Sequence, residues 1–272
     1  MYKKAYGIIE TLAPLHVGAA AGEETGNLNL IFRDQFTQTG VIPGSSIRGR
    51  FRSDARQNGM SDDDVNFWYG HEAEKNKTES TTESYVKFEY ASLLWLPVFC
   101  PGQPIVWVTC PRLLKRYKRF VDKLKDEDIP ELYTGSQTLN ALLINGQKKL
   151  FFNFGFLAVE HTADLTPWFP SGEEFPAVVV ADDEIGMIHD MALYRQSRAP
   201  LEKDQKRVVN FFGVEALPEG TILAFPIAIR PTENKTWNPF NENLQSDIYD
   251  IYLGGLESIG FGHCQISLHG DI

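Results

Sequence analysis

The stretch from residue 41 to residue 52 constrains the fold of this chain more than any other. It reads Val-Ile-Pro-Gly-Ser-Ser-Ile-Arg-Gly-Arg-Phe-Arg. Two apolar residues and a proline predict the end of a strand and a turn, and Ser45 or Ser46 can cap the helix that follows. A helix start presents unpaired N–H groups, with the positive end of the helix dipole behind them. The stretch therefore predicts a strand, a turn and a helix that together can hold an anion.

Three arginines add guanidinium groups to this helix start: Arg48, Arg50 and Arg52. The spacing from Gly44 to Gly49 resembles the phosphate loop of nucleotide hydrolases. That loop continues with Lys and then Ser or Thr, where this chain has Arg50 and Phe51. A nucleoside-triphosphate site is therefore excluded. Taken alone, the stretch is explained equally well by a turn and a helix cap with a solvated basic face.

Composition bounds the class of protein. The chain has 272 residues and is 43% hydrophobic, enough to bury a sizeable core in one large domain or two small ones. A formal net charge of −10 argues against binding nucleic acid with the whole surface, but it is compatible with binding by a basic strip. The amino terminus has no apolar signal region, and no apolar run is long enough to span a bilayer. We therefore expect a cytoplasmic protein without a membrane partner.

The cysteines are three in number: Cys100, Cys110 and Cys264. An odd count at wide spacing predicts buried thiols in a reducing compartment, not a disulfide framework or a zinc knuckle. The acidic run at 182–184, followed by His189 and Asp190, is explained better as a helix start than as a metal site, because the helix dipole alone stabilises carboxylates there.

Local patterns predict a mixture of strands and helices. Alternation and short apolar runs predict strands over 3–14, 28–33, 85–90, 93–99, 105–109, 221–229 and 264–268. Helical spacing predicts helices over 48–57, 60–69, 113–124 and 244–253. Asn58-Gly59 predicts the end of the first helix, and Ser61, which precedes three aspartates, predicts the cap of the second. Residues 70–84 are almost all Glu, Lys, Thr, Ser and Asn, which is typical of a flexible insertion.

Two further segments are unusually basic or glycine-rich. Residues 193–212 predict a two-stranded protrusion whose polar tip is surrounded by basic residues: Arg195, Arg198, Lys203, Lys206 and Arg207. An ordinary surface hairpin is the alternative. The loop over 254–262 contains four glycines that would let a backbone approach phosphates or another chain: Gly254, Gly255, Gly260 and Gly262. A helix predicted before this loop is the wrong order for a dinucleotide site.

Three segments resemble signatures of the RAMP superfamily of CRISPR proteins, whose members hold a guide RNA. They are Leu-His-Val-Gly at 15–18, Ile-Pro-Gly-Ser-Ser-Ile-Arg-Gly at 42–49, and the glycine-rich loop at 253–262. In the middle of the chain, Leu-Leu-Trp-Leu-Pro-Val at 93–98 and Val-Thr-Cys-Pro at 108–111 precede a basic helix. This combination is similar to one branch of the superfamily, the repeated backbone subunits of type III-B (Cmr) effector complexes. The resemblance weakens between about residues 125 and 190.

The resemblance implies a fold and a set of partners. The implied fold is α+β, one RAMP-type domain over 1–272, with an RRM-like or ferredoxin-like palm, an antiparallel sheet, insertions and a thumb-like β-hairpin at 193–212. The implied partners are crRNA, single-stranded target RNA, further copies of the chain packed head to tail, and other type III CRISPR subunits. The implied RNA-binding residues are His16, Gly18, Arg33, Ser45, Ser46, Arg48, Arg50, Arg52, Gly254, Gly255, Gly260 and Gly262. We expect the three arginines at 48–52 to face one groove with His16 and the terminal glycines.

The basic helix predicted over 113–124 has two readings. Its positive face consists of Arg112, Lys115, Arg116, Lys118 and Arg119. A solvated amphipathic helix and an RNA contact explain this face equally well.

In the resembled family, an aspartate between the first two signatures cleaves target RNA. In this chain, a gapless register on Arg33 and Asp34 puts Leu28 where that aspartate belongs. Leucine can neither ligate Mg²⁺ or Mn²⁺, which cleavage would require, nor act as a base. The neighbours Asn27 and Asn29 also lack a carboxylate, and the nearby acids Glu23, Glu24 and Asp34 lie outside the register.

We therefore expect an RNA-binding scaffold whose own cleavage activity is doubtful. Two alternatives remain open from the sequence. One is an active metal-dependent endoribonuclease of the same complex. The other is an α+β enzyme that acts on a small phosphorylated ligand.

Overall fold

The computed structural model describes residues 1–18, 28–71, 82–153, 155–198, 212–239 and 248–272. Its α-helices are α1 (Gly44–Gln57), α2 (Asp62–Tyr69), α3 (Pro111–Lys118) and α4 (Ile185–Ala192), and its 3-10 turns are η1 (Asp122–Leu124), η2 (Thr166–Trp168) and η3 (Glu257–Ile259). The strands of the first half are β1 (Lys3–Thr11), β2 (Leu28–Asn29), β3 (Val41–Ile42), β4 (Val86–Phe88), β5 (Ala91–Cys100), β6 (Gln103–Thr109) and β7 (Thr134–Ser136). Those of the second half are β8 (Leu142–Ile144), β9 (Gln147–Phe152), β10 (Gly155–Val159), β11 (His161–Ala163), β12 (Ala177–Val179), β13 (Tyr194–Arg198), β14 (Phe212–Ala216), β15 (Ile222–Ile229), β16 (Ile248–Tyr252) and β17 (His263–Gly270).

The main sheet runs in the order β11-β7-β12-β6-β5-β15-β1-β17-β16, with β3 also on β5 and β4 also on β15. Its central strands are antiparallel, and Ile9 of β1 lies between Leu223 and Ile266 on the two neighbouring strands. The sequence predicts an antiparallel sheet, but the sheet is mixed, because β12 runs parallel to β6 and β11 runs parallel to β7. Long connections return these strands to the sheet, and such connections permit parallel pairing where a hairpin does not. The α+β class is confirmed.

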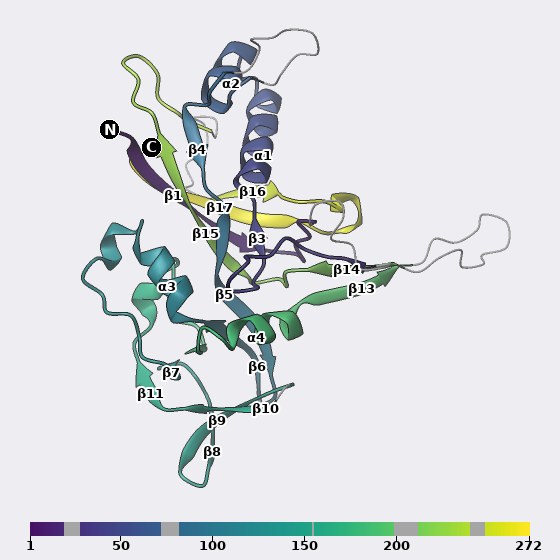
Figure 1. Ribbon diagram of the computed structural model, residues 1–272, viewed down its shortest axis with the longest axis vertical. Coiled ribbons are helices and arrows are strands. Elements are labelled where there is room, and N and C mark those ends of the chain that lie inside the picture. The colour runs from purple at the N-terminus through teal and green to yellow at the C-terminus, as the bar shows by residue number, and fades with distance from the viewer. Residues whose placement is uncertain (19–27, 72–81, 154, 199–211, 240–247) are drawn as a thin grey trace, which may run out of the picture.

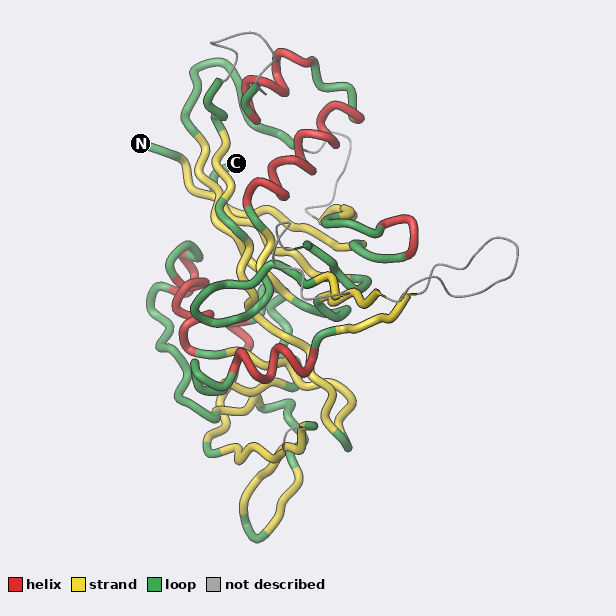
Figure 2. Tube along the Cα trace, turned by 45° about the vertical axis from the view of Figure 1, so that its right-hand side comes forward, coloured by secondary structure: helices red, strands yellow, loops and turns green. Residues whose placement is uncertain are grey.

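Figure 1 and Figure 2 place α1 and α2 at one end of the molecule and the small sheet β8-β9-β10 at the other. Helix α1 buries Ile47, Phe51 and Ala55, which recur every four residues and so share one face. These side chains belong to a core that also contains Phe225 of β15 and Trp237. A second core lies under α3 and α4. Both cores therefore anchor helices on the same long sheet.

One predicted helix is wrong. Residues 248–252 of the helix predicted over 244–253 form strand β16, which pairs with β17, and residues 244–247 lie outside the described residues. The segment reads Ile-Tyr-Asp-Ile-Tyr, and its alternation buries Ile251 while its neighbours stay partly or fully exposed. A period of two residues therefore outweighed the helical spacing read over the longer window.

Other boundaries shift. The helix predicted over 48–57 begins four residues earlier, at Gly44, and the one predicted over 113–124 divides into α3 and η1. Of the strand predicted over 28–33, only Leu28–Asn29 is regular. Ser61 caps α2 through a hydrogen bond from the Asp64 N–H, as its sequence predicts. Of the insertion predicted over 70–84, residues 72–81 lie outside the described residues.

All three cysteines are buried free thiols, as predicted. Burial raises the pKa of the Cys110 and Cys264 thiols to about 12, so both are protonated at neutral pH. Within the described residues, no helix combines the length and the apolar character needed to cross a membrane.

Candidate functional site

Helix α1 begins where it does because Gly44 lies against the end of β4. A Cβ on Gly44 would lie 2.2 Å from the carbonyl oxygen of Phe88, so no larger residue fits there. The residue before the helix is Pro43, whose carbonyl accepts from the N–H groups of Ser46 and Ile47. The prediction that Ser45 or Ser46 caps the helix is wrong, because both serines already lie in its first turn and no side chain caps it.

A hollow of about 660 Å³ lies along one side of α1. It brings together segments from both ends of the chain: the 16–18 segment, the outer face of α1 and the loop that follows β16. The lining residues predicted from the sequence are His16, Gly18, Ser46, Arg50, Gly254 and Gly255. Gly49 and Ser53 of α1 complete that face. Half of the predicted binding residues therefore meet in one place.

Two of the terminal glycines serve chain packing. Gly254 has φ +77°, and a Cβ there would lie 2.2 Å from the carbonyl oxygen of His16. Gly262 donates its N–H to Pro14, and a Cβ there would lie 2.4 Å from the carbonyl oxygen of Leu253. The glycine loop is thus held directly against the 14–16 segment.

Gly49 and Gly255 have a different environment. A Cβ on either residue would meet no atom within 4 Å. The same holds for Gly260, but Gly260 does not line the hollow. Gly49 and Gly255 therefore leave open space on two sides of the hollow, where a ligand backbone could approach the main chain.

His16 is fixed at the edge of this hollow. Its Nδ1 lies 2.7 Å from the carbonyl oxygen of Glu215, which can only accept a hydrogen bond. Nδ1 therefore carries a proton, and Nε2 makes no hydrogen bond with any described residue, so in the neutral tautomer its lone pair is an acceptor. This nitrogen faces Gly18, where a Cβ would lie 3.2 Å away. The ring thus presents a hydrogen-bond acceptor beside the hollow.

The arginines do not converge as predicted. Arg50 reaches the hollow, but its guanidinium is paired with Asp54 at 2.9 Å and lies 3.7 Å from Glu257. Arg52 turns toward α2 and donates to the Asn66 side-chain oxygen at 3.2 Å. Arg48 lies on the opposite side of α1. Positions two apart on a helix point to nearly opposite sides, so Arg50 cannot share a groove with Arg48 and Arg52, which are four residues apart and start from the same face.

Arg48 has a separate environment. It lines a smaller hollow of about 210 Å³ together with Ser45 and Lys87. Within the described residues, its guanidinium makes no hydrogen bond or ion pair. Arg48 is therefore available to a ligand, in contrast to Arg50 and Arg52.

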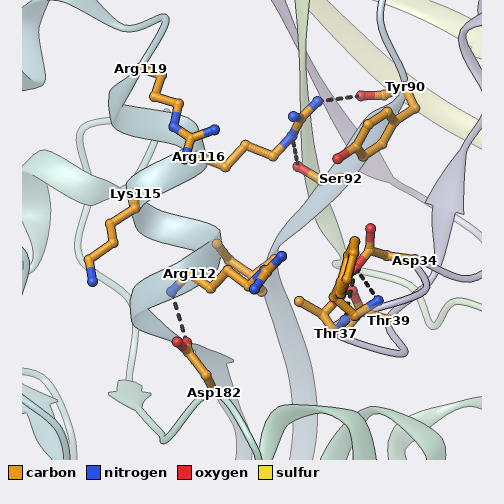
Figure 3. A pocket seen from close by; sticks show the side chains of 12 residues that line it. Asp34, Thr37, Thr39, Tyr90, Ser92, Arg112, Lys115, Arg116, Arg119 and Asp182 are labelled. Atoms are coloured by element: carbon orange, nitrogen blue, oxygen red, sulfur yellow. Dashed lines mark hydrogen bonds between the residues drawn. The ribbon is translucent and has the colours of Figure 1, made fainter.

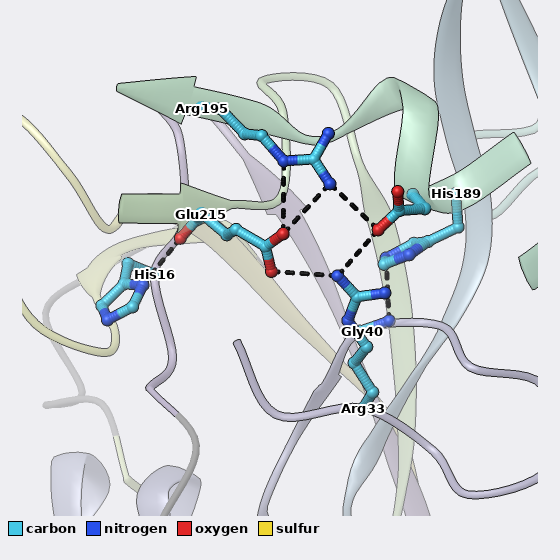
Figure 4. A network of polar contacts seen from close by, with 7 residues as sticks. His16, Arg33, Gly40, His189, Arg195 and Glu215 are labelled. Carbon is cyan, nitrogen blue, oxygen red and sulfur yellow. Dashed lines mark hydrogen bonds and ion pairs between the residues drawn. The ribbon is translucent and has the colours of Figure 1, made fainter. Parts of the chain in front are cut away.

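Arg33 belongs to an ion-pair network around the buried Glu215, at the base of the β13–β14 hairpin (Figure 4). It donates to Glu215 at 2.9 Å and to Asp190 at 3.1 Å. Arg195 of β13 donates to the same two carboxylates at 3.0 Å and 2.9 Å. Burial raises the pKa of Asp190, but the hydrogen bond from Arg33 and the charge of Arg195 outweigh it and hold that pKa below its ordinary value. Arg33 and Arg195 therefore stabilise the fold and are not free for RNA phosphates.

His189 lies beside this network and is fully buried. Its Nε2 accepts a hydrogen bond from the Gly40 N–H at 2.9 Å (Figure 4). Burial and the charge of Arg33 lower the pKa of the His189 imidazole to about 3, so it is neutral at physiological pH. This contact could not be predicted from the sequence, because 149 residues separate the two partners.

The predicted hairpin is present at its base. β13 and β14 pair antiparallel, with Arg198 opposite Phe212, and the Arg198 guanidinium carbon lies 5.6 Å from the centre of that ring. The returning strand ends at residue 216, four residues beyond the predicted limit. Lys203, Lys206 and Arg207 lie outside the described residues.

The described residues do not fit a divalent metal ion at the register position. Leu28 lies on β2, which pairs with β14, and its side chain has no ligand atom. Asn29 follows on the same strand, while Asn27, Glu23 and Glu24 lie outside the described residues. In the described part of the chain, no three His, Cys, Asp or Glu side chains are grouped as a metal site requires. The Mg²⁺ or Mn²⁺ that cleavage would need therefore has no identified ligands.

The fold and the hollow define an α+β protein of RAMP type. The family model of the RAMP superfamily matches residues 8–265, and the chain belongs to this superfamily. No curated protein matches the sequence.

Among solved structures, the fold is similar to that of Cmr4 and of type III-B Cmr assemblies. A chain in the cryo-EM structure of type III-B Cmr-beta bound to cognate target RNA is 20% identical, with a TM-score of 0.72 over 97% of this chain and 96% of that chain. A crystal structure of Cmr4 is 18% identical, with a TM-score of 0.66 over 98% and 99% of the two chains. Oligomeric Cmr4 from Pyrococcus furiosus is 17% identical, with a TM-score of 0.65 over the full length of both chains. The likeness is therefore one of fold along the whole chain.

Proposed function

We propose that this chain is a guide-RNA-binding backbone subunit of a type III CRISPR ribonucleoprotein. The observation that carries the proposal is the hollow beside α1, where the 16–18 segment, the first turns of α1 and the loop at 254–255 converge. These are the three segments whose sequences resemble the superfamily's signatures. In the proposed assembly, β5, β15, β1 and β17 with α1 act as the palm.

The hollow suits a phosphate backbone better than a base. Its cation, Arg50, is already paired, so recognition rests on the Ser46 hydroxyl and the open space at Gly49 and Gly255. Such contacts fix the register of a strand without reading its sequence, which suits a subunit that must accept any guide. The free Nε2 of His16 can accept a hydrogen bond from a ribose 2′-hydroxyl, a group that DNA lacks.

The proposed partners are crRNA, single-stranded target RNA, other type III CRISPR subunits and further copies of the chain. Copies that pack head to tail form open filaments. The β13–β14 hairpin is the proposed thumb that reaches a neighbouring copy. Support comes from the fold, because the similar structures include an oligomeric Cmr4 and a Cmr-beta complex with target RNA.

RNA binding is tested by placing a carboxylate in the hollow. Gly49→Glu projects a negative charge from an exposed helical position with no atom in its way, so the helix should form normally. The matched control is Gln57→Glu, which adds the same charge at the exposed far end of α1. Each protein is purified from cells that express a CRISPR transcript, and bound RNA is measured by ultraviolet absorbance and sequencing.

We expect crRNA with the unmodified chain and with Gln57→Glu, and at least a tenfold loss with Gly49→Glu, as repulsion of one phosphate contact predicts. If both variants retain equal amounts of RNA, the RNA-binding site is not in the hollow. A protein purified without any nucleic acid would contradict the proposal and favour a small phosphorylated ligand.

Target cleavage by this chain is proposed to be absent, because Leu28 stands at the position of the family aspartate. The purified complex is incubated with matched target RNA and Mg²⁺ or Mn²⁺. Products at regular spacing would contradict the proposal and restore the endoribonuclease alternative. Leu28→Asp is the companion variant, which should produce such cleavage if only the acid is missing.

A further inference from the structure

A second, basic hollow of about 440 Å³ lies between α3 and the turn at residues 34–39 (Figure 3). Four cationic side chains of the α3 segment line it: Arg112, Lys115, Arg116 and Arg119. The carboxylates Asp34 and Asp182 also line it. Asp34 accepts from the N–H groups of Phe36 and Thr37, and Asp182 accepts from the N–H of Arg112. Both acids are thus used by the backbone, and the hollow is positive in a chain of net charge −10.

Two aromatic rings lie under the guanidinium groups. The Arg116 guanidinium carbon is 4.0 Å from the centre of the Tyr90 ring, and its nitrogens donate to the Ser92 hydroxyl, the Tyr90 carbonyl and the Glu89 carboxylate, the last at 3.3 Å. The Arg112 guanidinium carbon is 4.9 Å from the centre of the Phe36 ring, which is 73% exposed. Stacking of this kind holds a guanidinium flat, and the Arg112 side chain makes no hydrogen bond or ion pair within the described residues, so its N–H edge is open to an anion.

Lys115 and Arg119 are the lining cations with the fewest partners. In the described part of the chain, their side chains make no hydrogen bond or ion pair. Like charges that line one hollow repel one another unless an anion lies between them. The arrangement therefore favours an anionic ligand at this place.

The basic hollow continues toward the start of α1. A hollow of about 430 Å³ shares Asp34 and Tyr90 with it. The small hollow that contains Arg48 and Lys87 shares Gly44, Ser45 and Phe88 with that middle one. We name this continuous surface the α3 furrow: Arg112, Arg116, Arg119, Phe36 and Tyr90 at one end, and Ser45, Arg48 and Lys87 at the other. It shares no lining residue with the hollow at His16 and Gly254.

We propose that the α3 furrow binds a second stretch of single-stranded RNA, with phosphates on Arg112 and Arg119 and a base against Phe36 or Tyr90. The inference rests on the proposed function, because a second RNA-binding surface is useful only in a chain that already holds one RNA strand. Exposed rings beside cations are the combination that binds single strands without reading sequence. Arg119 and Arg48, at the two ends, make no ion pair with any described residue, and this spacing matches a strand several nucleotides long better than one bound phosphate.

The binding test compares two double variants that remove the same charge. Arg112→Gln/Arg119→Gln empties the furrow of two cations, whereas Lys123→Gln/Lys125→Gln removes two exposed cations just beyond α3. The probe is a short fluorescent oligouridine, and its affinity for the purified protein is measured over a range of salt concentrations. We expect the furrow variant to bind at least tenfold more weakly, with the slope of log affinity against log salt reduced by about 2. The control should match the unmodified chain.

A crosslinking measurement locates the strand. An oligonucleotide containing 4-thiouridine is irradiated with the protein, and adducts are mapped by mass spectrometry. We expect adducts in the tryptic peptides 34–48 and 88–112, which contain Phe36 and Tyr90. Tyr90→Leu should reduce adducts in the second peptide and weaken binding roughly tenfold, because a stacked base is lost.

The outcomes separate this inference from the proposed function. If the unmodified chain binds no RNA, both fail. If it binds RNA but the furrow variant binds equally well, or all adducts lie at 16–18 and 254–262, the furrow alone is wrong. If the furrow variant keeps its RNA but loses a protein subunit of the complex, the furrow docks an acidic protein, which also overturns the inference.

Discussion

Arg33 and Glu215 are 182 residues apart in the sequence and are joined by a hydrogen bond of 2.9 Å. Glu215 is 2% exposed, and its other carboxylate oxygen accepts from Arg195. Its backbone carbonyl meanwhile holds His16 at 2.7 Å. Glu215 thus contacts three parts of the structure at once: the segment that leads into α1, the base of the hairpin and the edge of the candidate site.

Glu215→Gln should destabilise the protein. It removes the buried carboxylate charge that Arg33 and Arg195 share, and leaves Asp190 as their remaining carboxylate. Breaking a buried pair costs several kcal/mol, and because both arginines are partly exposed we expect a loss of about 2 kcal/mol in the free energy of unfolding. Urea denaturation measures it. The control is Glu219→Gln on the exposed turn, which should change stability by less than about 0.5 kcal/mol. Equal losses would show that the network contributes little.

His189 should make stability depend on pH. Its pKa is about 3 in the folded protein and 6.5 in a solvated chain, so between these values the unfolded state binds a proton that the folded state does not. Stability is therefore full above pH 6.5 and falls as the pH drops below it, by about 1 kcal/mol per pH unit while carboxylates are still ionised.

The matched variant for this prediction is His189→Gln, whose side-chain oxygen can accept the hydrogen bond from Gly40. Unfolding free energies of both proteins are measured in urea from neutral pH to about pH 5. We expect the free energy of unfolding of the unmodified protein to fall as the pH drops, and that of the variant to lack this dependence on pH. If the unfolding free energies of the two proteins fell equally with pH, the pH dependence would come from titratable groups other than His189.

Gly254 and Gly255 should lose very different amounts of stability on the same substitution. Gly254→Ala forces a Cβ to within 2.2 Å of the His16 carbonyl oxygen at a φ of +77°, and we expect a loss of about 3 kcal/mol. Gly255→Ala meets no atom within 4 Å, so its effect on stability should be below about 0.5 kcal/mol. Thermal unfolding followed by circular dichroism measures both. A stable Gly254→Ala protein would mean that the loop can move away from the 14–16 segment.

Local signals in the sequence predicted the elements that local chemistry determines. Ser61 before three acidic residues predicted the start of α2, and Asn58-Gly59 predicted the end of α1. The positions of the three signature segments in one hollow could be expected only through the resemblance, since they lie at opposite ends of the chain. Strand β16 was missed because a longer window with helical spacing concealed its alternation.

The roles of the arginines could not be predicted in full. The pairing of Arg50 with Asp54 follows from their spacing of four residues on a helix and was readable from the sequence. The pairing of Arg33 with Asp190 and Glu215 was not, because its partners come from distant elements that only the folded sheet brings together. For the same reason, the sequence could not show which glycines pack against the chain and which face open space.

Gly49→Ala should raise stability and lower RNA affinity at once. Gly49 lies in the interior of α1 with open space around it, and alanine favours a helix over glycine by about 0.5–1 kcal/mol. The added methyl group nevertheless enters the hollow where the phosphate backbone is proposed to approach the helix. We expect a higher melting temperature by circular dichroism and a severalfold weaker binding of guide RNA by filter retention. Because a general loss of folding would lower both quantities, opposite signs would assign the effect to the hollow itself. If stability and affinity both rise, RNA does not come close to α1 at this position.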